Sequence, residues 1–168
     1  MPGGLICSLT YRHDGEKGSI IMGKLYVAYG SNLSLAQMAA RCPSATIFGV
    51  GQLNNWELLY RGRNGNAHAT IAQKRGESVP VLVWNIKPAD EHSLDIYEGY
   101  PHYYYKRYVM VSIGEKVKRA MVYIMDEKQR PGRPSSEYVG TIYQGYIDNG
   151  LDISILENSL ETNFLECL

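Results

Sequence analysis

One short stretch decides how the chain begins to fold: Leu25-Tyr26-Val27-Ala28-Tyr29-Gly30-Ser31-Asn32-Leu33. Its first five residues are apolar and β-prone, so they predict a short buried strand. The strand should stop at Gly30, because glycine permits a backbone angle that other residues resist. Ser31, Asn32 and Ser34 are all good N-cap residues, so a helix should begin directly after this turn.

A glycine turn that leads into a helix start directs several unpaired N–H groups into one small space. The donors are fixed and the helix N-terminus is positive, so such a turn can bind an anion or a polarised carbonyl oxygen. Turns of this kind are also common as plain structural elements. The alternative is therefore a turn and a helix cap that hold no ligand.

The composition favours a single soluble globular domain. The 168 residues are 45% hydrophobic and 20% charged, which is enough for a sizeable core. The formal net charge is zero, so no basic surface indicates a nucleic-acid partner. No apolar run approaches the roughly 20 residues that cross a bilayer, so we expect no membrane partner.

The thiols and imidazoles show no metal-binding pattern. Three cysteines lie far apart and form no CxxC pair, and the four histidines are scattered. We therefore expect no metal site, and reduced thiols in a cytoplasmic protein. The chain has 14 tyrosines but two phenylalanines, so some tyrosines could line a polar pocket while most belong to the core or to surface strands.

Residues 1–23 lack the regular patterns that follow them. They have no ordered apolar segment with a small-residue cleavage site, so we do not predict a signal peptide. We predict instead an N-terminal extension over residues 1–23, which could be poorly ordered, and one domain over residues 24–168.

The remaining pattern predicts an α+β fold, a curved sheet or small barrel with a filled interior. Asn64-Gly65 and Gly114-Glu115 are tight-turn signals that join strands into hairpins. About seven strands are expected, over residues 25–29, 45–53, 56–60, 67–73, 79–86, 104–113 and 117–125. Four short helices are expected over residues 34–41, 89–98, 137–149 and 153–160.

A second informative stretch runs from Leu94 to Pro101 and contains Glu98 in the last turn of its helix. The carbonyl end of a helix is negative, and burial among tyrosines would raise the pKa of this carboxyl further. A carboxyl group tuned in this way can accept and return a proton near neutral pH, so Glu98 is a candidate general acid–base. The alternative is a solvated glutamate at a helix end. Asp95, one turn earlier, is expected to be exposed or to cap the helix.

Four motifs together resemble the γ-glutamylcyclotransferase-like (AIG2-like) family, over about residues 24–160. The order and spacing of the four make the resemblance specific. They are Tyr29-Gly30-Ser31-Asn32-Leu33; Val79-Pro80 with Trp84; Leu94-Asp95-Ile96-Tyr97-Glu98-Gly99-Tyr100-Pro101 with Tyr105, Arg107 and Tyr108; and Ser135-Ser136-Glu137-Tyr138 with Gly145-Tyr146-Ile147-Asp148-Asn149-Gly150-Leu151.

The resemblance implies a small mixed β-barrel of about six or seven strands with flanking short helices. It implies a reaction without a cofactor, in which the α-amine of a γ-glutamyl amide attacks its own γ-carbonyl and releases 5-oxoproline and a free amine. The family's catalytic glutamate corresponds to Glu98. Its substrate-binding loop corresponds to Tyr29, Gly30, Ser31, Asn32 and Leu33, and its pocket tyrosines correspond to Tyr105, Tyr123 and Tyr138.

Three functions remain open at this point. The leading one is cyclisation of a γ-glutamyl amino acid or γ-glutamylamine, and a close alternative is the same reaction on another γ-glutamylated metabolite or a protein-linked amine. The third is a binding module of the same fold that does not turn over its ligand, although such a module would not need an acid–base at Glu98. Either a monomer or a homodimer is compatible with each of these functions.

Overall fold

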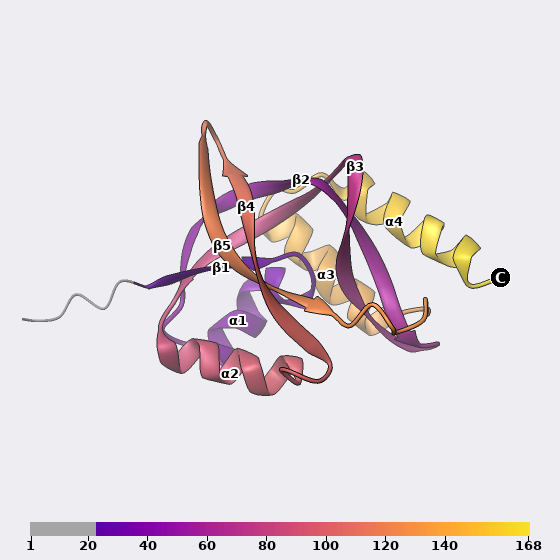
Figure 1. Cartoon of the computed structure of the whole chain (residues 1–168), viewed down its shortest axis with the longest axis horizontal. Coiled ribbons are helices and arrows are strands. Elements are labelled where there is room, and N and C mark those ends of the chain that lie inside the picture. Colours follow the sequence, from indigo (N-terminus) through magenta and orange to yellow (C-terminus); the bar gives the residue numbers. More distant parts are fainter. Residues whose placement is uncertain (1–22) are drawn as a thin grey trace, which may run out of the picture.

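A computed structural model of the protein describes residues 23–168. The predicted N-terminal extension over residues 1–23 therefore lies, apart from Gly23, outside the described residues. The described part is built on one closed barrel whose helices lie outside the strands (Figure 1).

Five strands form the barrel in the order β1-β3-β2-β4-β5, and β5 closes it by pairing with β1. β1 is antiparallel to β3 and parallel to β5, so the predicted mixed barrel with flanking helices is confirmed. The strands are β1 (Lys24–Ala28), β2 (Thr46–Arg63), β3 (Asn66–Ile86), β4 (Tyr104–Ile113) and β5 (Lys116–Met125).

Residues 23–168 form five strands rather than the predicted six or seven, because two pairs of expected strands are continuous. β2 runs through Asn54-Asn55, where the register shifts and Asn55 has a φ of 64°. On the partner strand, Gly76 has a φ of 90° and its N–H donates to Asn55 Oδ1 at 3.1 Å. Asn55 and Gly76 therefore mark a β-bulge that bends a long hairpin without ending its strands.

In the described part of the chain, four α-helices lie outside the barrel, and each begins where the sequence offers a cap or a proline. Ser34, Ser135 and Asp152 accept backbone N–H bonds at the starts of α1, α3 and α4, and Pro88 occupies the first turn of α2. The helices are α1 (Leu35–Arg41), α2 (Pro88–Glu98), α3 (Ser136–Asp148) and α4 (Ile153–Glu166), with a 3₁₀ turn η1 (Ser31–Leu33) before α1.

Helix α3 packs directly against the turn that follows β1. A Cβ atom added at Gly145 would lie 2.5 Å from Leu33 Cβ and 2.9 Å from the Leu33 carbonyl carbon, so only glycine fits here. Asn149 Nδ2 also donates to the Leu33 carbonyl oxygen at 2.9 Å. The close approach and the hydrogen bond together fix the turn against the barrel.

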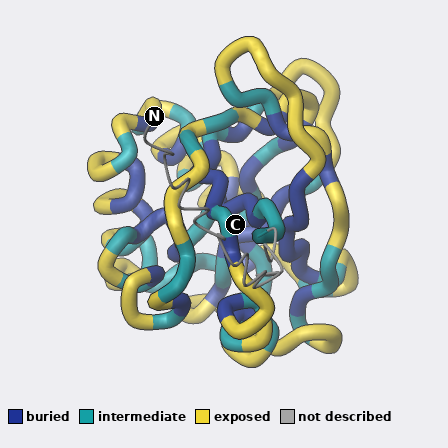
Figure 2. The backbone as a smooth tube through the Cα atoms, turned by 90° about the vertical axis from the view of Figure 1, so that its left-hand side faces the viewer, coloured by how far each residue is buried: buried dark blue, intermediate teal, exposed yellow. Residues whose placement is uncertain are grey.

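The buried residues fill the barrel and the layer beneath the helices, while the hairpin tips and helix surfaces are exposed (Figure 2). Tyr60, Leu53 and Met121 are among the largest side chains that are fully buried. Over residues 23–168, none of the helices is both long enough and apolar enough to cross a membrane.

Candidate active site

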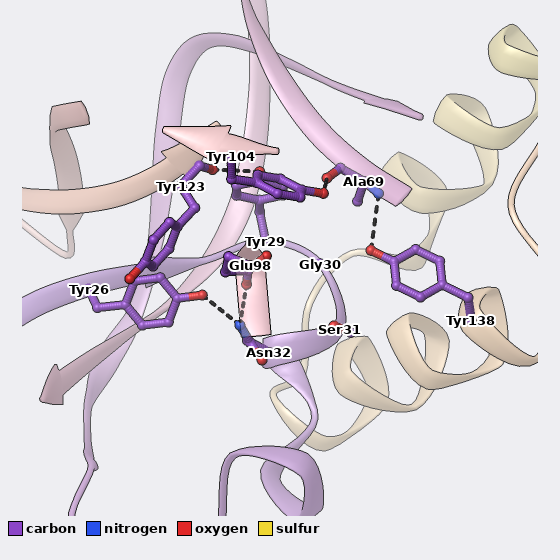
Figure 3. Close-up of a pocket in the computed structure, with 10 residues that line it drawn as sticks. All are labelled: Tyr26, Tyr29, Gly30, Ser31, Asn32, Ala69, Glu98, Tyr104, Tyr123 and Tyr138. Atoms are coloured by element: carbon purple, nitrogen blue, oxygen red, sulfur yellow. Dashed lines mark hydrogen bonds between the residues drawn. The ribbon is translucent and has the colours of Figure 1, made fainter. Parts of the chain in front are cut away.

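A narrow pocket lies where the turn after β1 meets the C-terminal end of α2 and the first turn of α3 (Figure 3). Its free volume is about 30 Å³, and we call it the inner hollow. Four strands and two helices contribute side chains or backbone to it. It is lined by Tyr26, Tyr29, Gly30, Ser31, Asn32, Ala69, Glu98, Tyr104, Tyr123 and Tyr138.

The turn after β1 forms one wall of the inner hollow. Leu33 N–H donates to the Gly30 carbonyl and Ser34 N–H donates to the Ser31 carbonyl, both at 3.0 Å, so these two donors close the 3₁₀ turn. The N–H groups of Gly30, Ser31 and Asn32 come earlier in the chain and do not take part in these two bonds. They are therefore the donors that the turn can offer to a ligand.

The space around Gly30 also favours glycine. Its φ is −115°, so it does not adopt a left-handed conformation. A Cβ atom at this position would instead lie 3.2 Å from Ala69 Cβ and 3.3 Å from the Tyr138 hydroxyl oxygen. A side chain here would crowd the two residues that border the inner hollow.

Glu98 carries its carboxyl group into this hollow from the last turn of α2. The helix ends immediately afterwards because Gly99 adopts a left-handed conformation with a φ of 63°. Burial of the carboxyl group is the largest influence on its pKa and raises it to about 7, although the Arg41 charge and a hydrogen bond from Asn32 act in the opposite direction. Glu98 can therefore exist in both protonation states near neutral pH.

Asn32 orients the Glu98 carboxyl group. Its side-chain nitrogen donates to Glu98 Oε1 at 3.0 Å and to the Tyr26 hydroxyl oxygen at 2.8 Å. Its side-chain oxygen accepts from Arg41 Nη1 at 2.5 Å, and its backbone oxygen accepts from Trp84 Nε1 at 3.2 Å. Tyr26 and Arg41 hold the side-chain amide and Trp84 holds the backbone, so the direction of the bond from Asn32 to Glu98 is also fixed.

Three tyrosines surround the carboxyl group with hydroxyls that are held by the backbone. The Tyr29 hydroxyl donates to the Tyr123 carbonyl and the Tyr104 hydroxyl donates to the Ala69 carbonyl, both at 2.7 Å. The Tyr138 hydroxyl accepts from Ala69 N–H at 3.0 Å. Burial is the largest influence on the pKa of all three and raises it, so they remain neutral at physiological pH.

Two of the pocket hydroxyls can donate to a ligand. Tyr138 accepts its hydrogen bond from Ala69 N–H, and Tyr26 accepts one from Asn32. A tyrosine that accepts in this way still has its own proton to donate. Both hydroxyls can therefore point a proton toward a carboxylate or carbonyl oxygen in the hollow.

Tyr123 is held by a carboxylate on α2. Its hydroxyl donates to Asp95 Oδ1 at 2.5 Å, and Asp95 also forms an ion pair with Lys106 at 2.7 Å. The Tyr123 ring meets the Tyr26 ring edge-on, with centroids 5.8 Å apart. Asp95, which the sequence presented as an exposed or capping residue, thus fixes one wall of the pocket.

A wider space of about 160 Å³ adjoins the inner hollow, and we call it the outer hollow. Both spaces share Ser31, Glu98, Tyr104 and Tyr138, so the Glu98 carboxyl group lies on their common boundary. The outer hollow adds three residues of its own: His68, Tyr97 and Tyr103.

Most of the candidate residues from the sequence meet at this pocket. The structure brings together Glu98 and the six residues Tyr29, Gly30, Ser31, Asn32, Tyr123 and Tyr138.

Two of the expected residues lie elsewhere. Leu33 is fully buried beneath α3, and its N–H closes the turn. Tyr105 points away from the pocket, and its hydroxyl donates to Glu127 Oε1 at 2.5 Å. Neighbouring side chains alternate across a strand, so Tyr104 occupies the position that we expected for Tyr105.

Three lining residues, Tyr26, Ala69 and Tyr104, were not anticipated. Tyr26 was interpreted as part of a buried strand, and nothing in the pattern of β3 distinguishes Ala69. Over residues 23–168, no group of three or more His, Cys, Asp or Glu side chains is arranged to hold a metal ion.

Comparison with known proteins gives a consistent result. The family model described as "Gamma-glutamyl cyclotransferase, AIG2-like" matches residues 26–140. The human protein named gamma-glutamylcyclotransferase is 30% identical over 146 residues, which is 79% of this chain and 75% of the human protein. The cattle protein of the same name is 29% identical over 83% of this chain and 79% of its own length.

Solved structures agree with the sequence comparison. A structure titled "Gamma-glutamyl cyclotransferase" superposes with a TM-score of 0.72 at 31% identity, over 82% of this chain and 86% of that one. The YkqA protein from Bacillus subtilis superposes with a TM-score of 0.71 over 83% of this chain and 54% of its own. At 17% identity, that second likeness concerns the fold alone.

Proposed function

The chain belongs to the γ-glutamyl cyclotransferase, AIG2-like family, and on that premise we propose that it is a cofactor-independent cyclotransferase. Its substrate is a γ-glutamyl amide, either a γ-glutamyl amino acid or a γ-glutamylamine. The α-amine of the glutamyl group attacks its own γ-carbonyl, a new C–N bond closes the ring, and the amide C–N bond breaks. The products are 5-oxoproline and the free amine.

Glu98 acts as the general acid–base in this proposal. The attacking amine must lose a proton, and the leaving nitrogen must gain one, so a single carboxyl group within reach of both can perform the two transfers in turn. The nucleophile belongs to the substrate, so no activated serine or cysteine is required. A carboxyl group with a pKa of about 7 can accept the proton and release it again at neutral pH.

The turn after β1 holds the glutamyl group. The N–H groups of Gly30, Ser31 and Asn32 face the charge that develops on the γ-carbonyl oxygen, and fixed donors stabilise such a charge without reorganising. The free hydroxyl protons of Tyr26 and Tyr138 add two neutral donors at the same wall. Holding the glutamyl chain bent brings its amine to its carbonyl, which supplies much of the rate advantage of a ring closure.

The observation that carries the proposal is the position of Glu98. Its carboxyl group is buried opposite the turn, is oriented by Asn32, and has a raised pKa. The alternative of a binding module without turnover requires no such group, because a ligand could be held by the turn and the tyrosines alone. The geometry therefore favours catalysis.

We also propose a cytoplasmic location and small-molecule partners only. Cys42 is a free and buried thiol, and Cys167 is free and partly exposed. Free thiols are usual in reducing compartments. The zero net charge offers no general attraction for nucleic acid, and we propose that residues 24–168 act as one domain, as a monomer or a homodimer.

The test is to incubate the protein with a panel of γ-glutamyl amides and to measure 5-oxoproline by mass spectrometry. We expect at least one amide to be converted, with 5-oxoproline and the free amine released in equal amounts. Calorimetric titration with 5-oxoproline provides the second measurement. Binding of 5-oxoproline without turnover of any amide in the panel would support the binding module and overturn the cyclotransferase.

A further inference from the structure

The proposed chemistry leaves the outer hollow without an assigned role. In the proposed function the glutamyl group is held at the turn that lines the inner hollow, and Glu98 lines both spaces. Because Glu98 must deliver a proton to the leaving nitrogen, the scissile bond has to cross the boundary between them. The substituent on that nitrogen then extends into the outer hollow.

The outer hollow is small and largely aromatic. Its free volume of about 160 Å³ is below the range of roughly 300–1,000 Å³ that is typical of pockets for drug-sized ligands. His68, on β3, meets Tyr138 edge-on with ring centroids 5.0 Å apart and meets Tyr103 in the same way at 6.1 Å. The Tyr103 hydroxyl lies 3.4 Å from His68 Nδ1, so the two side chains form one connected wall.

Among the described residues that line this space, Glu98 is the only acid and there is no lysine or arginine. Arg41 stacks on the Tyr97 ring at 3.4 Å and donates to Asn32, but it does not line the hollow. Burial lowers the pKa of His68 from its usual value, so its ring is uncharged at neutral pH. An ionised side chain on the leaving amine would be desolvated here with no fixed opposite charge, which is costly.

We propose that His68 and Tyr103 form the subsite for the leaving amine, and that His68 makes this subsite select leaving groups with a small uncharged side chain. The inference rests on the proposed cyclotransferase activity. His68 is a specificity residue in it, because it touches the departing part of the substrate and takes no part in the proton transfer.

The test compares γ-glutamyl-asparagine with γ-glutamyl-aspartate. The two substrates have the same α-carboxylate and nearly the same shape, so the ratio of their kcat/KM values reports only the side-chain charge. We expect the protein to prefer the asparagine substrate by about tenfold or more, because the aspartate side chain would lose hydration here without gaining an opposite charge.

His68→Lys should reverse this preference by placing a cation in the outer hollow. We expect the ratio to shift toward the aspartate substrate by about tenfold or more. His92→Lys is the matched control, because His92 is an exposed histidine on α2 and does not line either hollow. The control should keep the ratio of the unmodified protein to within about twofold.

His68→Trp is a second variant that does not depend on the lysine being tolerated. A larger ring should narrow the outer hollow and shift the preference toward γ-glutamyl-glycine over γ-glutamyl-phenylalanine, again by about tenfold. If both His68 variants turn over these substrates with unchanged ratios, the subsite assignment is overturned while the cyclotransferase stands. If the unmodified protein converts no γ-glutamyl amide, the proposed function itself has failed.

Discussion

Helix α2 carries Glu91 in its first turn and Glu98 in its last, and the surroundings of the two carboxyl groups differ. Glu91 accepts hydrogen bonds from Lys24 at 2.5 Å and from Lys106 at 2.7 Å. Burial alone would raise its pKa, but the two lysines outweigh burial and the pKa is lowered. Glu98 accepts from the neutral amide of Asn32, and its pKa is raised to about 7, chiefly by burial.

The two carboxyl groups differ in burial, which raises the pKa of Glu98 but is outweighed by the lysines at Glu91. They also differ in whether a lysine contacts the carboxylate. A lysine in contact stabilises the charged form, whereas an amide only moderates the cost of burying it. The end of α2 that lacks a lysine can therefore exchange protons near neutral pH, and the end that has two lysines serves to hold the helix against the barrel.

The largest expected effect is on catalytic activity, and it should distinguish the two ends of α2. Glu98→Gln keeps the size of the side chain but removes the carboxyl group that we propose as the general acid–base, so kcat should fall by about 10² to 10⁴. Glu91→Gln is the matched control and should retain kcat to within about threefold, because its carboxylate has a structural role. Steady-state release of 5-oxoproline measures both variants. An equal loss in the two would remove the distinction between the ends of α2.

The second effect is on stability, and it should have opposite signs in the same two variants. Between about pH 4.5 and about pH 7, the raised pKa keeps Glu98 protonated in the folded state while the same group is ionised in the unfolded state. The free energy of unfolding therefore falls across that interval as pH rises. Glu98→Gln abolishes this loss. At about pH 8 the variant should be more stable by on the order of 3 kcal/mol, and the gain should vanish near pH 4.

Glu91→Gln should behave in the reverse manner. Its lowered pKa contributes stability that is present above the unfolded value of about 4.5 and is lost as pH falls through the folded pKa. The variant should therefore be less stable at neutral pH and should match the unmodified protein in acid. Urea unfolding at several pH values measures both variants. Parallel curves for the two variants would show that their carboxyl groups have similar surroundings.

The sequence located the Glu98 end of α2 because its signals are local. A glutamate before a C-terminal glycine and a glycine turn before a helix cap are each contained in a few consecutive residues. The resemblance to a family joined these two stretches, which the barrel then brings together across 66 residues of chain from Asn32 to Glu98. Patterns contained in consecutive residues can be recognised without knowing how the strands pair.

The remaining features depend on register and could not be derived in the same way. Whether Tyr104 or Tyr105 faces the pocket is decided by the pairing of β4 with β5, and a shift of one residue would exchange them. The need for glycine at position 30 arises from Ala69 and Tyr138, which are distant in sequence. The bulge at Asn55 resembles a strand end locally, and only its partner Gly76 shows that the hairpin continues.

A smaller effect should come from Asp95, which lies between the two glutamates and holds Tyr123. Asp95→Asn keeps an oxygen for the Tyr123 hydroxyl but removes the charge that strengthens this bond and pairs with Lys106. We expect kcat/KM to fall by about three- to tenfold, while its dependence on pH near 7 is retained because Glu98 is unaltered.

Asp95 should act through Tyr123 and not on the substrate directly. Tyr123→Phe and the double variant therefore complete a thermodynamic cycle with Asp95→Asn. The double variant should lose about as much activity as the worse single variant. Strictly additive losses would mean that Asp95 has a role of its own at the site.

The smallest effect should come from Tyr105, on the face of β4 that points away from both hollows. Its hydroxyl bonds Glu127 at the surface, so Tyr105→Phe should change activity by less than about twofold and stability by less than about 0.5 kcal/mol. Tyr104→Phe is the paired variant and should lower activity more, because the Tyr104 hydroxyl is buried and anchored to the Ala69 carbonyl beside Glu98. Kinetics and urea unfolding measure both. If Tyr105→Phe were the more damaging change, β4 would have to be displaced by one residue, and every side chain of that strand would then face the opposite side of the barrel wall.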